Sequence, residues 1–338
     1  SFSYIEPHDP ISVPSMGYLS GGDLLYYSDG WLFNGTNSFG EIWGRCPPSW
    51  RTLSAAPLRD SDSGTVNAVN VFDPLLTQSY DFDSTVFDVL SYGEYIIAAL
   101  GNKGIEIFKQ GHPDTRVRIN LEKLQEQSSS AHRLKLTGNL LFVSAMESGV
   151  IVFDLSEVMT PRVISAGNDE TINSLDIYRD RLVAGGGTAG LRTLQLPAAI
   201  VLSTSVKEGE YLAADEPYRV TFNESIAIES VITDDVVQVT RTDTSEIVPV
   251  TITAIDQTDS SARIFDFDFA REAGVTYRID IDGVRNLRGT GQWAPFRQTF
   301  IQSNLNALRP FVSNIDNNVF HRGGQQTITL HGRNFRPE

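Results

Sequence analysis

A short phrase that recurs along the first 200 residues constrains the fold more than any other feature of the chain. Each copy is a loop glycine followed by alternating apolar residues, which is the pattern of a half-buried strand. The copies span residues 64–73, 104–108, 149–154 and 190–194. They lie about 40–45 residues apart, the length of a four-stranded propeller blade. One such unit cannot bury both of its faces, so neighbouring copies are expected to pack against each other.

The last three copies are preceded by a second apolar run and, before it, a polar turn. These runs are Tyr95–Ala99, Leu140–Ser144 and Arg181–Ala184. Each unit is therefore predicted to be strand, tight turn, strand, loop, strand. Further upstream, Asp29-Gly30 between apolar flanks predicts a hairpin of two strands at residues 23–27 and 30–33. Between two of the copies, residues 120–127 predict a short helix in a loop.

The residues at 138–144 and 149–154, Gly-Asn-Leu-Leu-Phe-Val-Ser and Gly-Val-Ile-Val-Phe-Asp, resemble the LVIVD-type β-propeller repeat. The resemblance covers about residues 20 to 200 and implies propeller blades over residues 1–203. The last copy departs from the pattern, with Leu194-Gln195 where Phe-Asp is expected. A closed ring of the usual size needs more copies, so we expect an incomplete propeller with further blades upstream of Ser1. Propellers have many functions, so the resemblance specifies no activity.

From residue 204 to 306 the chain is acidic and rich in threonine, with frequent apolar/polar alternation. Strands are predicted at 218–222, 236–241, 247–255, 262–267 and 276–281, and Pro249 makes the third of these an edge strand at best. Short strands with polar turns and no helical period predict a β-sandwich. The phrases at 218–224 and 274–286 resemble bacterial Ig-like domains of the S-layer and adhesin kind, which implies an Ig-like sandwich here.

The tail, residues 307–338, resembles the opening of an IPT/TIG domain. It has a proline-led strand at 309–315, then a Gly-Gly turn and the run Thr-Ile-Thr-Leu-His-Gly-Arg-Asn-Phe. About 30 residues cannot complete a sandwich, so the parent protein is expected to continue past Glu338. The predicted fold class is thus all-β, an incomplete β-propeller followed by an Ig-like β-sandwich.

The charge balance limits the kinds of molecule that the chain is expected to bind. With 27 basic and 42 acidic residues the formal net charge is -15, which repels phosphate backbones and anionic lipid. No apolar run approaches the roughly 20 residues of a spanning helix, so no membrane insertion is expected in this segment. Cys46 is the single cysteine, so no internal disulfide can form. This composition fits a secreted or cell-surface bacterial protein, with any export signal upstream of Ser1, although it equally permits a cytosolic one.

Three tryptophans, Trp31, Trp43 and Trp50, fall close together in the sequence. Packing between sheets is their simplest interpretation, and the alternative is a binding face, an aromatic platform for a sugar or peptide. Asp60-Ser61-Asp62-Ser63-Gly64 alternates short oxygen ligands before a glycine turn, so Asp60 and Asp62 are calcium candidates. The run lacks the later glutamate of an EF-hand loop, and an ordinary solvated turn is favoured. No other cofactor is predicted.

The sequence predicts no catalytic residues and hence no enzyme. The glycine-rich run 184–190 aligns with the repeat loops and lacks the Lys-Ser/Thr of a phosphate loop. The five histidines show no zinc spacing, and His112-Pro113-Asp114 is interpreted as a turn. The paired acids Asp266 and Asp268 share one strand face, predicted to point to solvent.

We therefore expect a non-catalytic binding, adhesion or scaffolding segment of a large secreted or surface bacterial protein. The propeller face is the expected platform for a protein or glycan, and the Ig-like modules are the expected spacer next to other domains of a longer chain. The alternative is an accessory part of an extracellular carbohydrate-active or other hydrolytic enzyme. A deep pocket with convergent acids would favour that alternative.

Overall fold

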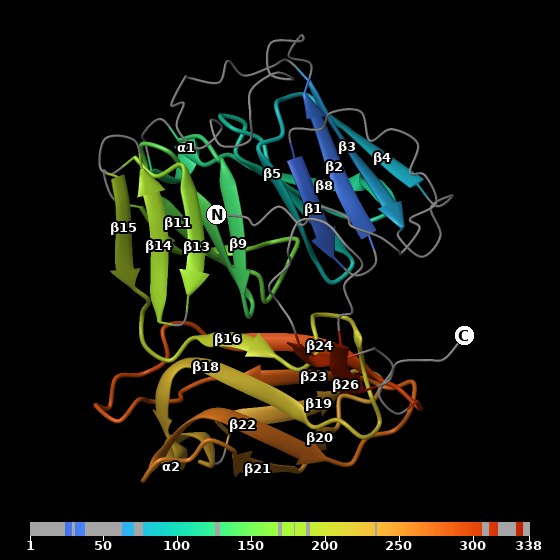
Figure 1. The fold of residues 1–338 in the computed structure, drawn as a ribbon, viewed down its shortest axis with the longest axis vertical. Helices are drawn as coiled ribbons and strands as arrows, with labels where there is room; N and C mark the ends of the chain where they lie inside the picture. Colours follow the sequence, from blue (N-terminus) through green and yellow to red (C-terminus); the bar gives the residue numbers. More distant parts are fainter. Residues whose placement is uncertain are drawn as a thin grey trace. The chain divides into compact units, whose positions relative to one another are not determined.

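The computed structural model describes residues 24–28, 31–37, 63–70, 77–125, 129–167, 171–178, 180–186, 190–233, 235–305, 311–316 and 329–333. Over these residues the protein is all-β, with two helices of a single turn (Figure 1). The chain divides into two compact units. The first takes most of residues 1–193, and the second takes residues 194–338 together with 136–140 and 177–182.

The first unit is a series of sheets in which strands consecutive in sequence lie side by side. The pairs within the first two sheets are antiparallel. Such a succession of meander sheets is a β-propeller arrangement. The strands are β1 (Leu24–Ser28), β2 (Trp31–Asn37), β3 (Gly64–Asn70) and β4 (Thr77–Phe82), then β5 (Asp88–Tyr92), β6 (Tyr95–Ala99), β7 (Ile105–Lys109) and β8 (His112–Ile119), then β9 (Arg133–Thr137), β10 (Leu140–Ser144), β11 (Val150–Asp154) and β12 (Arg162–Ala166), then β13 (Ser174–Tyr178), β14 (Arg181–Gly186) and β15 (Gly190–Gln195).

The strands β6 and β10 are buried on both faces, as expected where a neighbouring sheet packs on each side. Every residue of β10 is buried, and so are four of the five in β6. Between the first two sheets the core is built around Phe108, whose ring lies 4.9 Å from that of Tyr80 and 6.0 Å from that of Phe82. Continuous apolar runs such as Leu140-Leu141-Phe142-Val143 are thus the sequence signature of a strand held between two sheets.

The anchor glycines close the same loop in successive copies. Leu100 N donates to Gly104 O at 2.8 Å, and Ala145 N donates to Gly149 O at 2.8 Å. Gly104 has φ +86°, and a Cβ there would lie 2.0 Å from the carbonyl oxygen of Ile119. Only glycine fits this combination of left-handed backbone and close approach. The repeat predicted from sequence is therefore a repeat in structure.

The first three sheets contain a fourth, outer strand that the predicted three-strand unit lacked. In the second sheet this strand is β8, and residues 112–114, interpreted as a turn, form its start. That prediction was wrong because a proline is tolerated on an edge strand, where its missing N–H is not needed by the ladder. The helix predicted at 120–127 is confirmed as α1 (Glu122–Gln125), and the Asp29-Gly30 hairpin is confirmed by the pairing of Ser28 with Trp31.

The second unit has two sheets around one core. Its buried cluster includes Phe222, Phe265 and Phe267 from one sheet and Tyr277 and Phe300 from the other. Its elements are β16 (Val201–Thr204), β17 (Tyr211–Leu212), β18 (Tyr218–Ala227), α2 (Ile228–Val231), β19 (Val237–Arg241), β20 (Ile247–Val248), β21 (Val250–Ala254), β22 (Ser261–Phe269), β23 (Thr276–Ile281) and β24 (Phe296–Gln302). One sheet has the order β16-β18-β22-β21 and the other β17-β24-β23-β19-β20. Two sheets around one core occur in several fold families, so the Ig-like resemblance stays a prediction.

The strand predicted at 247–255 is two strands in different sheets. β20 pairs with β19 in one sheet, and β21 pairs with β22 in the other. Pro249 lies between them, where its missing N–H and fixed φ favour a change of sheet rather than a continuous ladder. Both strands are sheet edges, as the proline predicted.

Near the predicted boundary at residue 203, β16 pairs with β18 and so belongs to the second unit. In the tail, β25 (Phe311–Asp316) pairs antiparallel with β26 (Thr329–Arg333). The IPT/TIG resemblance stays a prediction. None of the helices in the described residues has the length and apolar character needed to cross a membrane.

Candidate functional site

The site residues predicted from sequence fall largely outside the described residues. Trp43, Trp50, Asp60 and Asp62 lie there, so the aromatic platform and the calcium turn stay predictions. Trp31 begins β2, and its side chain is not among those described. Among the described residues no group of three or more His, Cys, Asp or Glu side chains could hold a metal ion.

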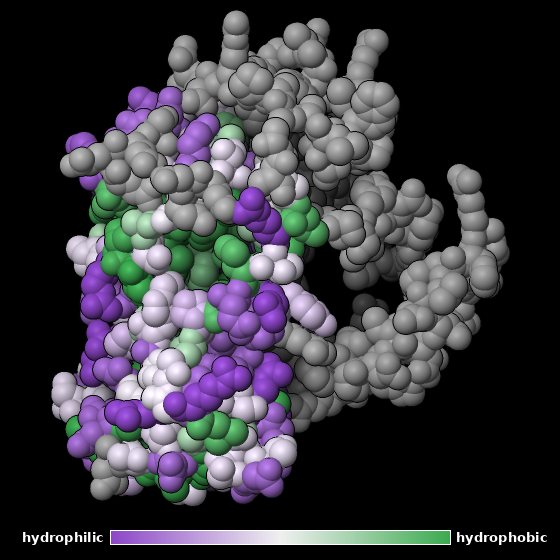
Figure 2. Space-filling view, turned by 90° about the vertical axis from the view of Figure 1, so that its left-hand side faces the viewer, coloured by the Kyte–Doolittle hydropathy of each residue, from purple (hydrophilic) through white to green (hydrophobic). Residues whose placement is uncertain are grey.

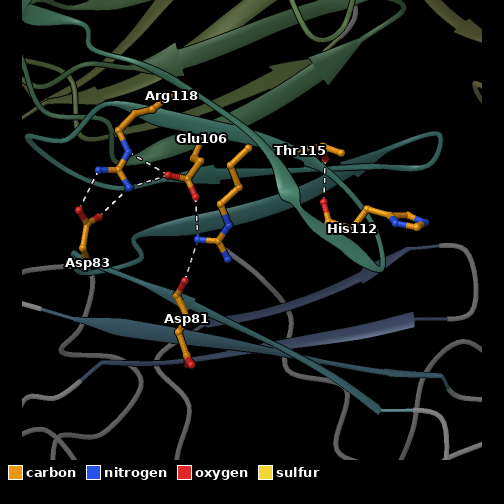
Figure 3. Close-up of polar contacts among 7 residues, drawn as sticks. Asp81, Asp83, Glu106, His112, Thr115 and Arg118 are labelled. Carbon is orange, nitrogen blue, oxygen red and sulfur yellow. Dashed lines mark hydrogen bonds and ion pairs between the residues drawn. The ribbon is translucent and has the colours of Figure 1, made fainter.

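Among the described residues, a group of four charged side chains joins the first two sheets of the first unit (Figure 3). Glu106 on β7 is 2% exposed. Its carboxylate forms ion pairs with Arg116 at 2.9 Å and with Arg118 at 2.6 Å, both on β8. Arg118 also holds both carboxylate oxygens of Asp83, at 2.6 and 3.0 Å. Arg116 donates to the backbone oxygen of Asp81 at 2.7 Å. We call Asp83, Glu106, Arg116 and Arg118 the charge network.

The charge network is stabilised by its own opposite charges. The hydrogen bonds from Arg118 hold the pKa of Asp83 below its usual range, and those same bonds raise the pKa of Arg118. Arg116 lies 4.7 Å above the Phe82 ring and 5.0 Å above the Phe108 ring, within cation–π range. Two acids and two arginines thus neutralise one another. Their hydrogen bonds hold the two sheets together, so the charge network is a structural connection between sheets.

A second joint connects the second and third sheets. Asp88, at the start of β5, accepts hydrogen bonds from Val89 N and Leu134 N, both at 2.9 Å. Burial raises the pKa of Asp88, and Arg133 opposes that shift. The His132 ring stacks on Phe87 with centroids 4.1 Å apart. Burial, together with the nearby Arg133, lowers the pKa of His132 from 6.5 to about 4.

Because of His132, the stability of the first unit is expected to fall with pH below neutrality. Between pH 6.5 and about 4 the unfolded chain binds a proton that the folded chain excludes, so unfolding is favoured as pH falls. The loss between pH 7 and pH 4.5 is about 2 kcal/mol. Replacing His132 by Phe keeps the stack on Phe87 and removes this part of the pH dependence. Hydrogen exchange of the β5 and β9 amides of both proteins under native conditions, corrected at each pH for the intrinsic exchange rate, measures the difference.

His112 supplies the matched control, since it is an exposed histidine on β8. His112→Phe is measured in parallel, as the same substitution at an exposed site. Asp88 changes the free energy of unfolding with pH in the opposite direction to His132. Because its pKa is raised in the folded chain, Asp88 adds stability as pH falls. The comparison is therefore made between variants rather than on the wild type alone. Equal pH slopes for His132→Phe and the wild type would show that the stacked ring titrates as it does in the unfolded chain.

The last sheet of the first unit differs from the others in how much of it is exposed. It has the order β13-β14-β15, with no fourth strand among the described residues. Of the six residues in β15 only Leu194 is half-buried, and the other five are exposed. At the matching positions of β7 and β11, Ile105 is fully buried and Val150 is half-buried, whereas Leu191 of β15 is 75% exposed. The sheet thus presents to solvent a strand that the repeat elsewhere buries.

The remaining acids singled out in the sequence are surface groups. Asp266 holds Arg219 through two hydrogen bonds of 2.6 and 2.8 Å, and Asp268 on the same strand is exposed. The phenylalanines that alternate with them are buried, so the predicted solvent-facing placement is confirmed. Of the glycine-rich run 184–190, Gly187 to Ala189 lie outside the described residues.

Sequence reasoning missed the charge network. Arg116-Val117-Arg118 places two arginines on one face of a strand, and this alternation was the available signal. It went unused because residues 112–119 are too polar to be predicted as a strand. Glu106 also carried a signal, since it is an acid within the otherwise apolar run Ile105–Phe108.

Comparison with known proteins gives no family. No family model matches the chain, and no curated protein matches it either. Among solved structures, the computationally designed Ika4 protein is 12% identical over 53% of this chain and 94% of that one, with a TM-score of 0.37. The designed Ika8 protein is 11% identical over 73% and 70%, with a TM-score of 0.34. PorZ, a surface component of the type-IX secretion system of Porphyromonas gingivalis, is 11% identical over 83% of this chain and 38% of that one, with a TM-score of 0.35. At these TM-scores the similarities carry no argument about function.

Proposed function

We propose that the chain is a non-catalytic binding and scaffolding segment of a larger secreted or surface bacterial protein. The observation that carries the proposal is the exposure of β15, where Leu191 is 75% exposed although the matching Ile105 of β7 is fully buried. An apolar side chain on an exposed strand favours contact with another protein. The first unit is then the platform, and the second unit is the spacer.

Rigidity of the platform supports the proposal. The charge network joins the first two sheets, the Asp88–Leu134 bond joins the next pair, and an ion pair of 2.5 Å between Lys135 and Asp176 joins β9 to β13. A surface held on such a scaffold loses little conformational entropy when a partner binds. Binding proteins commonly place their contact surfaces on rigid elements for this reason.

The spacer role is supported by the second unit's own packing. Its two sheets enclose one core rich in aromatic residues, which suits a module that folds on its own. The phrases that resemble Ig-like and IPT/TIG domains, together with the low cysteine content, support a bacterial surface setting. An Ig-like identity and an LVIVD-type identity are parts of this proposal.

Site-directed cross-linking in the source bacterium tests the proposed function. A photo-cross-linking residue replaces Leu191, and in a matched control it replaces Thr251, which is exposed on β21 of the second unit. We expect adducts with another protein from position 191 and none from position 251. Digestion of intact cells with protease should remove the chain if it lies at the surface. Equal adduct yields from the two positions, or none from either, would contradict a binding platform on the first unit.

A further inference from the structure

The connector that leads from β15 to β16, residues 197–200, is bound to the rest of the second unit. Ala199 and Ile200 are 0% and 3% exposed. The backbone N–H of Trp293 donates to Ala198 O at 3.2 Å. Ala199 has φ +53°, a left-handed conformation that alanine rarely adopts, so the connector is held against a backbone cost. Compact units are usually joined by exposed linkers, so this burial requires a specific cause.

Asn223 and Glu224 on β18 bind the connector through their side chains. Asn223 Nδ2 donates to Pro197 O at 3.0 Å, and Asn223 Oδ1 accepts from Ile200 N at 2.8 Å. The backbone N–H of Asn223 also donates to Ile200 O at 2.9 Å. Glu224 Oε1 accepts from Ala199 N at 2.9 Å. Two neighbouring side chains thus satisfy the backbone of the connector before the ladder of β16 begins.

An irregularity in β18 brings these side chains to the connector. The register of β18 with β22 shifts between Thr221 and Ile226, so residues 222–225 leave that ladder. A bulge of this kind re-aims side chains that would otherwise alternate between two faces. Glu224 is held in turn by Asn286, whose Nδ2 lies 3.3 Å from each carboxylate oxygen. We call Asn223, Glu224 and Asn286 the clasp.

The clasp gives a physical role to two phrases of the sequence. The phrase at 218–224 ends in Asn223-Glu224, and the phrase at 274–286 ends in Asn286. The second unit, in the lower part of Figure 2, shows a mainly hydrophilic surface, where polar side chains are solvated. Asn223 and Asn286 are instead 3% and 8% exposed. Buried amides with specific partners indicate a structural role rather than a solvated turn.

We propose that the clasp makes the connector part of the fold of the second unit, so that the spacer carries the platform without a free linker. A free linker would let the platform and its bound partner move independently of the spacer. Hydrogen bonds along residues 197–200 remove that freedom from the connector. This inference rests on the proposed function, because it states how the spacer is attached to the platform.

Native-state hydrogen exchange of the full chain tests the proposal. In the wild type we expect the Ala199 and Ile200 amides to be protected as strongly as those of β18. Glu224→Ala removes the acceptor of Ala199 N but leaves that of Ile200 N in place. Because the clasp acts as a unit, the Ile200 amide should still exchange about tenfold faster, the factor expected for a lost hydrogen bond to a charged group. Glu229→Ala, the same substitution at an exposed residue of α2, should leave the protection of Ile200 unchanged.

A second variant separates the clasp from a general loss of stability. Phe300→Leu weakens the core of the unit at a residue outside the clasp, so it should speed exchange of β24 and of the connector to the same extent. Glu224→Ala should instead affect Ile200 more than β24. An unprotected Ile200 in the wild type, or a Glu224→Ala variant that changes Ile200 no more than β24, would overturn the proposal.

The same measurements separate this inference from the proposed function. Adducts from position 191 together with an unprotected connector would contradict the clasp alone. A protected connector without adducts would instead contradict the proposed function and leave the clasp standing.

Discussion

Replacing Glu106 by Gln is expected to destabilise the first unit by about 3 kcal/mol. The carboxylate is 2% exposed, and both of its partners are arginines that stay charged at any accessible pH. An amide of the same shape removes the negative charge and leaves Arg116 and Arg118 facing a neutral group in a partly buried site. Their side chains are 26% and 34% exposed, so water offsets part of the loss.

Hydrogen exchange of the β7 and β8 amides under native conditions measures this effect locally. A local measurement is required because a chain of two compact units need not unfold in one transition. Asp83→Asn is the matched control. It removes a carboxylate from the same network, but Asp83 is 61% exposed, so the cost should stay below about 1 kcal/mol. If the two variants lost equal protection, burial would not be what makes Glu106 important.

Much of the first unit could be predicted from the sequence, because its repeat is a recurring pattern of apolar residues. The runs at Tyr95–Ala99 and Leu140–Ser144 coincide with β6 and β10 to the residue. Both strands lie between sheets, so nearly every side chain in them is buried and apolar, and a polar turn precedes each. Tertiary packing and local pattern agree there, which is the condition under which sequence reasoning succeeds.

The outer strands could not be predicted in this way. β8 is mostly exposed and carries a proline and two arginines, so it has neither apolar alternation nor high strand propensity. Its position is set by pairing with β7, which includes a register shift between Ile107 and Lys109. A shift of this kind is a tertiary feature that no local pattern records.

The charge network depends on those outer strands, so it could not be predicted from the sequence either. The pairing of Glu106 with Arg118 depends on the register of β7 and β8, and the pairing of Arg118 with Asp83 depends on how two sheets pack. The exposure of β15 could not be predicted from the sequence for a different reason. Its sequence still follows the repeat, and only the strand order shows that no fourth strand follows it in the described residues.

The two units have separate cores, and this separation determines how damage to one core should spread. The core of the second unit draws residues from both of its sheets, and the cluster around Phe108 in the first unit shares none of them. Phe300 is fully buried in the second unit. Its ring lies 5.2 Å from that of Tyr218 and 5.8 Å from that of Tyr277.

Replacing Phe300 by Ala should therefore destabilise the second unit by about 4 kcal/mol, because it removes a buried ring and leaves a cavity that its aromatic neighbours cannot fill. Phe300→Leu retains much of the volume and should cost about half as much. Leu287→Ala, at a residue 58% exposed, should cost less than about 0.5 kcal/mol. Hydrogen exchange of the β23 and β24 amides measures the loss, and the β7 amides report on the first unit in the same experiment. Because the two clusters share no residue, protection of β7 should be unchanged. A parallel loss there would mean that the two units unfold as one, and that the spacer is part of the platform.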